Sequence, residues 1–358
     1  MALQARRIAS ALTCLVAASA VASACDVPVF RYALERWTPD PYEVLVFHRG
    51  PLPAARQACL DRLTRSTADT GGNANLVVRT VDLSGDVPAS FHALWTREKS
   101  AAPPWMVLVY PRSHIGRRRV WSGPLDDTSV AAILDSPVRT EMADRIVGGQ
   151  TAVWVLIEGG DKAKDDAAEA MLRKELALMP GRLSLPPELA EEVPHLASHL
   201  RIEFSVLRIR LKDPAEQVLT AMFLRSEGDL QTTYAGEPVV FPVYGRGRTL
   251  CALVGQGIRP GTILMGCRFL VGRCACEFKD ENPGVDLLMN YPWRQSLTVS
   301  VVDMIELPTP IGQGDTVPGP GRADNGGSGA LILSVGMVIG FILVVTVALV
   351  IRMGRKRQ

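Results

Sequence analysis

The stretch FHRGPLPAARQAC, residues 47–59, decides which fold the sequence predicts. It starts at the end of a short apolar strand expected over residues 44–47. It then leads into a helix-compatible pattern over residues 51–63, where a proline is tolerated in the first turn. The turn between strand and helix reads Arg49-Gly50-Pro51-Leu52. A strand, a tight glycine–proline turn and a helix in immediate succession indicate an α/β fold.

The rest of the first half continues this alternation. The run VFRYALERW before the strand is helical in pattern, and residues 76–83 predict a second strand, followed by a weaker helix from Ala89. Residues 105–110 and 119–122 predict a hairpin across RSHIGR, and DDTSVAAIL predicts an N-capped closing helix.

The second half repeats this plan. A buried strand is expected in TAVWVLIEGGD, residues 151–161, and the strong helix AKDDAAEAMLRKELALM follows it. A strand over residues 204–211 and the helix AEQVLTAMFLRSE come next. The run VVFPVYGRGRTLCALVG predicts a hairpin that turns at residues 245–247, and residues 262–271 predict the closing helix. The segment between residues 180 and 200 is an addition to the plan.

This order of elements, together with several short motifs, resembles the thioredoxin fold over residues 40–137. The turn RGPL stands where that family has Cys-Gly-Pro-Cys, and Pro103-Pro104 stands where it places a cis-proline. VDLSGDVP resembles its strand with a buried aspartate, and VWSGPL its last strand and glycine turn. The resemblance implies an α/β chain of two thioredoxin-like domains in tandem, residues 25–137 and 138–306, with Pro242 in the cis-proline role of the second.

Neither turn carries the sulfur chemistry of that family. Thiol–disulfide exchange needs a thiolate at the helix N-terminus and a second cysteine to resolve the mixed disulfide. Arg49 and Leu52 supply neither, and Cys59, two helical turns further on, is expected to pack as a small hydrophobe. The second turn, residues 159–162, also lacks sulfur. There Asp161 is expected to cap the helix, with anion binding at the helix N-terminus as the weaker alternative.

Both ends of the chain carry targeting signals. Residues 1–24 read as a signal peptide, with Arg6 and Arg7 before an uncharged run and Ala22-Ser23-Ala24 as the cleavage site. Residues 307–329 are rich in Pro and Gly and predict a linker. Residues 330–351 are uncharged and about 33 Å long as a helix, enough to span a bilayer, and the basic tail 352–358 follows. Because basic residues stay inside, this predicts a single-pass protein of the cytoplasmic (inner) membrane with its ectodomain on the periplasmic side.

Two further features concern the membrane. Cys25 directly follows the cleavage site, so it is a candidate for lipidation, although Ala22 stands where a lipobox usually has leucine; ordinary cleavage at Cys25 is the other interpretation. Gly336 and Gly340 form a GxxxG pair that would let two membrane helices approach, which makes a homodimer a candidate assembly.

The densest chemical signal is the cysteine cluster Cys267, Cys274 and Cys276. The mature chain keeps six of the seven cysteines, and exported cysteines usually form disulfides, here with Cys251 as a further partner. Free thiols, a soft metal ion such as copper or zinc, and redox exchange remain as alternatives. Structural disulfides are favoured because the cluster lacks a histidine and repeated metal-ligand spacing.

Other polar groups carry weaker signals. His195 and His199 share a helical spacing, but the glutamate of a zinc-protease motif is missing, so a solvated pair is favoured. A basic hairpin tip is expected to be solvated rather than bound to lipid headgroups; it contains Arg112, His114, Arg117, Arg118 and Arg119. The chain has 39 basic and 37 acidic residues, which gives no reason to expect a nucleic-acid partner. No nucleophile elbow, Walker loop or dinucleotide fingerprint is found in its required context.

The whole chain also resembles a family of exported bacterial proteins that share an ACxVPVFRYALERW start, here residues 24–37, with likeness through NPGVDLLM, residues 282–289. That resemblance implies no particular reaction. The sequence therefore predicts a membrane-tethered binding or assembly module with an extracytoplasmic protein partner, no enzymatic activity and no cofactor. The alternative is a thiol-redox or soft-metal protein that acts through Cys267, Cys274 and Cys276.

Overall fold

The computed structural model describes residues 25–99, 101–111, 118–187, 189, 200–274, 279 and 282–297. The chain divides into two units, residues 1–308 and 309–358, and the second unit lies wholly outside the described residues. So do the predicted signal peptide, linker, membrane helix with Gly336 and Gly340, and basic tail. Within the described ranges, no helix has both the length and the apolar character needed to cross a membrane.

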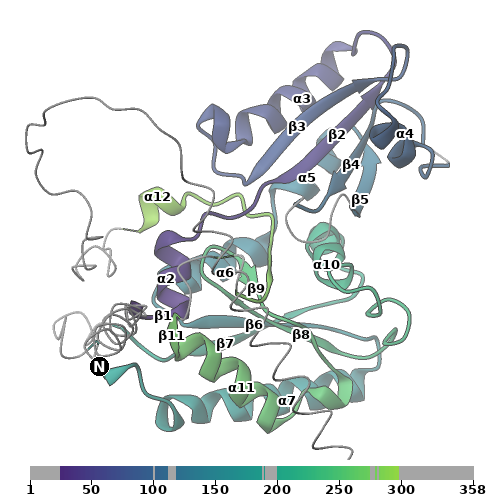
Figure 1. Cartoon of the computed structure of the whole chain (residues 1–358). Helices are drawn as coiled ribbons and strands as arrows, with labels where there is room; N and C mark the ends of the chain where they lie inside the picture. The colour runs from purple at the N-terminus through teal and green to yellow at the C-terminus, as the bar shows by residue number, and fades with distance from the viewer. Residues whose placement is uncertain are drawn as a thin grey trace, which may run out of the picture. The chain divides into compact units, whose positions relative to one another are not determined.

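The first sheet has four strands in the order β3-β2-β4-β5 (Figure 1). Strand β2 runs parallel to β3, whereas β4 is antiparallel to both β2 and β5. The strands are β2 (Tyr42–His48), β3 (Leu76–Asp82), β4 (Trp105–Val109) and β5 (Arg119–Pro124). The helices between and after them are α3 (Ala54–Ser66), α4 (Ala89–Trp95) and α5 (Asp127–Leu134), and a short turn η1 (Ala68–Thr70) follows α3.

The alternation of side chains along β2 places helices on both faces of this sheet. Val44 and Val46 are buried in the cluster that contains Cys59 and Leu63 of α3 and the apolar residues of α5. Leu45 and Phe47 point the other way and pack near Leu94 of α4. A strand buried on both faces explains why residues 44–47 read as a continuous apolar run rather than an alternating one.

The second sheet follows the same plan, with the order β12-β9-β8-β6-β7 and β10 also paired to β8. Strand β6 is parallel to β7 and antiparallel to β8, as β2 is to β3 and β4. The strands are β6 (Ala152–Ile157), β7 (Phe204–Ile209), β8 (Val239–Tyr244), β9 (Arg248–Thr249), β10 (Leu253–Val254) and β12 (Val285–Asp286). The helices are α7 (Lys162–Arg182), α10 (Gln217–Leu224) and α11 (Pro260–Val271), with η2 (Pro214–Glu216) and η3 (Gly255–Gly257).

One apolar core joins the inner faces of the two sheets. It combines residues of α3 and α5 with residues of α10 and of α6 (Pro137–Val147), a helix that the sequence analysis did not predict. Phe223 of α10 stacks on Phe241 of β8 with ring centroids 4.7 Å apart. The Tyr110 hydroxyl donates to the Met222 carbonyl, and Arg225 donates to the Val120 carbonyl over 2.7 Å. The first sheet is therefore attached to α10, which covers the second.

The N-terminal segment packs against the second sheet, although the sequence analysis grouped it with the first. Strand β1 (Cys25–Pro28) pairs with β11 (Arg273–Cys274), and α2 (Val29–Arg36) follows β1 directly. Most apolar side chains of residues 27–37 are buried with Ala152, Tyr244 and Leu270, while Leu34 belongs to the core shared with the first sheet. The chain crosses to the first sheet only at residues 38–41.

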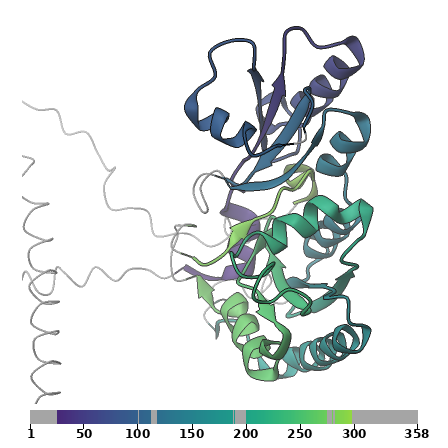
Figure 2. The ribbon, with the colours of Figure 1, turned by 90° about the vertical axis from the view of Figure 1, so that its right-hand side faces the viewer.

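The last described segment, residues 282–297, lies between the two sheets (Figure 2). Asn75, just before β3, donates through its side chain to the Leu287 carbonyl and accepts from the Met289 N–H. Leu287, Leu288 and Met289 are almost fully buried, and the short helix α12 (Trp293–Ser296) follows. The NPGVDLLM run is thus part of the shared core.

Two expectations about proline have opposite outcomes. The Pro103–Pro104 bond is cis, as predicted, and it is the one cis bond within the described residues. The prediction that Pro242 takes the same role is wrong. Pro242 lies inside β8, opposite Trp154, while the position just before that strand belongs to Pro238. The cis-proline role requires the proline of the apolar run VVFPVY to precede a strand. In the structure the strand begins three residues before it.

Candidate functional site

The turn at residues 49–52 lies between β2 and α3, where the sequence predicts it. Gly50 adopts φ +60°, a left-handed conformation suited to glycine, and its N–H donates to Asp82 Oδ1 over 3.2 Å. The same oxygen accepts the Ser84 N–H over 2.9 Å, and His48 Nδ1 lies 2.8 Å from the Gly50 carbonyl. The bonds from Ser84 and Gly50 hold the pKa of the Asp82 carboxyl below its ordinary value. The turn is a well-bonded scaffold whose outward side chains are Arg49 and Pro51.

The one thiol near this turn is not poised for attack. Cys59 lies on the buried face of α3, as predicted, and its sulfur donates to Asp127 Oδ1 over 3.5 Å. Burial and the Asp127 carboxylate raise the pKa of the Cys59 thiol above its ordinary value. A thiol in such a setting stays protonated and unreactive at neutral pH.

The second turn is closed by two carboxylates of its own helix. Asp161 caps α7, as predicted, by accepting the Ala163 and Lys164 N–H groups over 2.9 and 3.3 Å. Asp165, which is 1% exposed, accepts the N–H of Gly159 over 2.8 Å and of Gly160 over 3.2 Å. These groups occupy the donors that an anion would use, so the structure favours capping over anion binding.

The role of Asp165 was not predicted from the sequence. Its reach back to the two glycines depends on the turn folding against the loop before β8, where a Cβ on Gly159 would lie 2.5 Å from the Gly236 carbonyl oxygen. The available signal was the spacing of Gly159-Gly160 and an acidic residue in the first turn of a helix, which typically binds nearby backbone N–H groups.

The cysteine cluster does not form one site among the described residues. Cys267 is fully buried in α11, in the apolar cluster that contains Trp154 and Leu172, and burial raises the pKa of its thiol well above the ordinary value. Cys251 is exposed and not in a disulfide. Cys274 ends β11, while its side chain and the whole of Cys276 lie outside the described residues. In the described ranges, no group of three or more His, Cys, Asp or Glu residues is placed to hold a metal ion.

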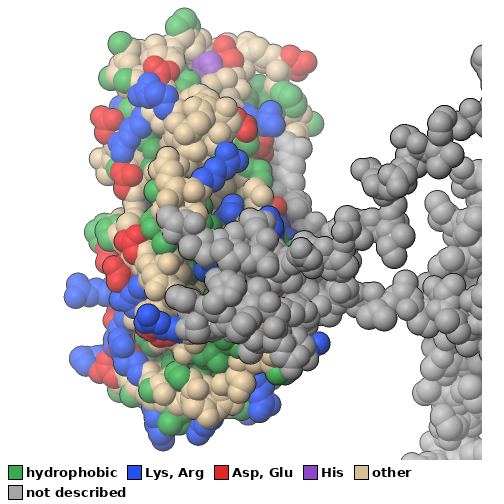
Figure 3. Space-filling view, turned by 90° about the vertical axis from the view of Figure 1, so that its left-hand side faces the viewer, with side chains coloured by type: hydrophobic (Ala, Val, Ile, Leu, Met, Phe, Trp, Pro, Cys, Tyr) green, Lys and Arg blue, Asp and Glu red, His purple; other side chains and the backbone are tan. Residues whose placement is uncertain are grey.

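Most of the remaining polar candidates lie outside the described residues, namely Arg112, His114, Arg117, His195 and His199. Of the basic hairpin tip, Arg118 and Arg119 are described. Arg118 is exposed, as expected, whereas Arg119 forms an ion pair of 2.7 Å with Glu98. The face of the molecule drawn in Figure 3 carries acidic and basic side chains interspersed, without a large field of one sign. Such a mixed surface does not select strongly for either charge in a partner.

Two cavities open on either side of the edge strand β3. One, of about 320 Å³, lies against α3 and includes Leu60, Asp61, Val78 and Thr80 in its lining. The other, of about 300 Å³, lies at the start of β2; its lining includes Tyr42, Glu43, Val77, Arg79, Tyr110 and Pro111. Because neighbouring residues of a strand point to opposite faces, Val77 and Val78 each contribute to a different cavity.

Between these cavities, the outer edge of β3 has backbone N–H and C=O groups that do not bond to β2. Tyr42 N–H donates to the Asn75 carbonyl over 3.0 Å, and the parallel register continues from Tyr42 opposite Leu76 to His48 opposite Asp82. In a parallel pair every second residue bonds to a given neighbour, so Val78 and Thr80 turn their N–H and C=O groups away from β2. In the described part of the chain, no further strand pairs with β3 on that side.

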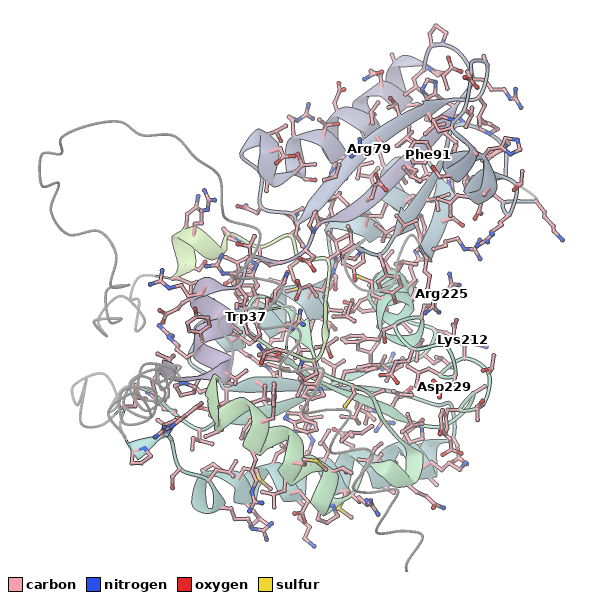
Figure 4. The ribbon with its side chains drawn as sticks, in the orientation of Figure 1. Trp37, Arg79, Phe91, Lys212, Arg225 and Asp229 are labelled. Carbon is pink, nitrogen blue, oxygen red and sulfur yellow. The ribbon has the colours of Figure 1, made fainter. Side chains whose placement is uncertain are left out.

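The charged side chains at this edge are arranged in local pairs. Arg79, labelled on β3 in Figure 4, forms an ion pair with Glu43 of β2, while Gln57 donates to Asp61 over 2.8 Å on the other face. Each cavity has a mixed lining: Leu60 and Val78 are the apolar residues of the first, beside mostly polar and charged ones, and Val77 and Tyr110 are among those of the second. This surface was not predicted from the sequence, because an edge strand is defined by the order of the sheet and not by a motif.

We compared the chain with protein-family models and with curated proteins, and neither comparison found a match.

Proposed function

We propose that this chain is a membrane-tethered binding or assembly module outside the cytoplasm, built on two thioredoxin-like units without dithiol chemistry. In support of the fold, both sheets have the same parallel and antiparallel pairing, each with helices on both faces, and a cis-proline precedes β4. The tether and the location rest on the signal peptide and the apolar segment expected from the sequence.

The observation that carries this proposal is the state of the two turns. In each, the position that would hold a reactive thiolate has no sulfur. Asp82 binds the Gly50 N–H in the first turn, and Asp165 binds the Gly159 and Gly160 N–H groups in the second. Dithiol exchange has no group to start from at either turn. A fold that keeps the turn and the proline but not the sulfurs retains a scaffold, and its surfaces remain for binding.

The alternative, thiol-redox or soft-metal chemistry through Cys267, Cys274 and Cys276, is less well supported. The thiolate is both the nucleophile and the metal ligand, and burial raises the pKa of Cys267 so that its thiol keeps the proton. Efficient reduction of insulin disulfides by the purified protein would overturn the binding proposal. So would a stoichiometric copper or zinc ion that is lost when Cys274 and Cys276 are replaced by serine.

The binding surface that we assign is the outer edge of β3 with its two cavities. An extended segment of a partner protein would bond to the outward backbone groups of Val78 and Thr80 and so add a strand to the sheet. Adjacent residues of that segment would point to opposite faces, one into each cavity. Since a valine of β3 contributes to each cavity, Val78 to one and Val77 to the other, the segment should carry two adjacent apolar residues that pack against them.

A peptide-binding measurement tests this surface. The probes are fluorescent eight-residue peptides of β-branched and polar residues with a central Val-Val pair, or with Ser-Ser as the control. We expect the Val-Val peptide to bind at least tenfold more tightly by fluorescence polarisation. The Thr80→Pro substitution should abolish binding, because it removes an outward N–H and is tolerated on an edge strand. The control is Arg173→Ala on the exposed face of α7, which should bind the peptide normally. Alanine is used there because a proline would break the helix. Equal binding of both peptides, or unchanged binding to Thr80→Pro, would overturn the assignment.

A further inference from the structure

The first described strand of the chain pairs with a strand near the end of the folded part. Strand β1 runs antiparallel to β11, with Cys25 directly opposite Cys274 and Pro28 opposite Arg273 across a register shift (Figure 1). The Val29 N–H donates to the Gly272 carbonyl over 3.0 Å, so the contact continues into α2. Two cysteines about 250 residues apart in the sequence therefore occupy facing register positions.

Facing positions of an antiparallel ladder match the reach of a disulfide. Their Cα atoms are about 4.5 or 5.5 Å apart, depending on the type of pair. A disulfide joins residues whose Cα atoms are about 4.4–6.8 Å apart. Among the cysteines whose side chains the structure describes, Cys59, Cys251 and Cys267 are free thiols, and Cys59 and Cys267 are buried in apolar clusters.

We propose that Cys25 and Cys274 form a disulfide that ties the N-terminus of the mature chain to β11. The proposal rests on the extracytoplasmic location proposed above, where disulfides form and persist. The two thiols lose two protons and two electrons to a disulfide-bonded thiol oxidant, which leaves as two thiols after exchange through a mixed disulfide. The sulfur of Cys25 is then committed, so this bond and a lipid thioether on Cys25 exclude each other.

Peptide mapping of the full chain, extracted from membranes with detergent, tests the bond. Free thiols are blocked with N-ethylmaleimide before trypsin digestion without reduction. We expect a linked pair of peptides, residues 25–31 and residues 274–279, which separates on reduction. Because the second peptide also contains Cys276, the variants Cys274→Ser and Cys276→Ser decide the partner. The link should persist in Cys276→Ser and vanish in Cys274→Ser. If either variant fails to accumulate, fragmentation of the wild-type peptide between residues 274 and 276 gives the same answer.

The other outcomes contradict the proposal in distinguishable ways. A lipid mass on the residue 25–31 peptide would assign the sulfur to anchoring instead. Blocked thiols on both peptides would mean that the bond does not form. An alkaline phosphatase fusion after residue 306 separates the causes: an active fusion with free thiols refutes the disulfide alone, and an inactive fusion with free thiols refutes the extracytoplasmic location as well.

Discussion

Replacing Asp165 by alanine should destabilise the protein more than replacing Asp161, although both carboxylates lie at the start of α7. Asp165 is 1% exposed and binds the N–H groups of two glycines in the turn. Hydrogen bonds to charged groups contribute about 1.5–3 kcal/mol each, less where the donor is exposed, as Gly160 is. The loss of both, reduced by the cost of burying the charge, is expected to be about 2–3 kcal/mol. Asp161 is an exposed N-cap, for which the loss is about 1 kcal/mol.

Equilibrium urea unfolding of the purified wild type, Asp165→Ala and Asp161→Ala measures this difference. We expect both variants to keep the slope of the unfolding free energy against urea, and Asp165→Ala to have the lower midpoint. Asp165→Asn, which keeps one acceptor oxygen, should lie between wild type and Asp165→Ala. If Asp161→Ala were as destabilised as Asp165→Ala or more, the buried carboxylate would not hold the turn, and our account of why the second turn is closed to anions would be wrong.

Two further results are expected. Below pH 9 the Cys267 thiol is protonated in both states. Above the ordinary thiol pKa of 9.0 only the unfolded chain releases the proton, because burial raises the pKa in the folded protein, so stability falls with rising pH. This thiol contributes a slope that approaches about 1.4 kcal/mol per pH unit, and urea unfolding of Cys267→Ala between pH 8 and 10 should show a shallower fall than wild type. Phe223→Ala should cost about 3–5 kcal/mol, because it removes a fully buried ring stacked on Phe241. Hydrogen exchange should then show both sheets losing protection together, whereas loss of protection in the second sheet alone would contradict the shared core.

Local signals were sufficient for most elements of the fold. The strand–turn–helix order at residues 44–66, the cap at Asp161 and the hairpin turn at residues 245–247 each follow from a pattern of a few residues. Helix α6 could also have been predicted, since a serine followed by a proline, Ser136-Pro137, is typical of a helix start. In the structure Ser136 caps the helix by accepting the Arg139 N–H, and Pro137 is the first helical residue. That helix was overlooked because it follows α5 after only two residues, where the first half was expected to end.

Other features depend on contacts that no local pattern contains. The helical run VFRYALERW reads the same whether α2 packs on the first sheet or the second, and its burial with Tyr244 and Leu270 selects the second. Arg139 is 3% exposed and donates over 2.7 Å to the carbonyls of both Ile133 and Leu288, so a charged residue bonds to the core shared by the two sheets. Burial lowers the pKa of Arg139 to about 10, a cost that only a tertiary arrangement explains. The cavities beside β3 belong to the same class, because they exist only once the strand order is known.

The pairing of β1 with β11 has a consequence for the order in which the chain is made. Residues 25–36 leave the ribosome early, but the strand and helix that cover them end at residues 274 and 271. At about 5–20 residues per second, the intervening part takes about 12–50 s to synthesise. For most of that interval the apolar face of Val29, Phe30 and Ala33 lacks Tyr244 and Leu270, and long-range contacts of this kind form slowly. A segment made early is thus among the last to find its place, which makes it the natural binding site for a holding chaperone while the rest of the chain is completed.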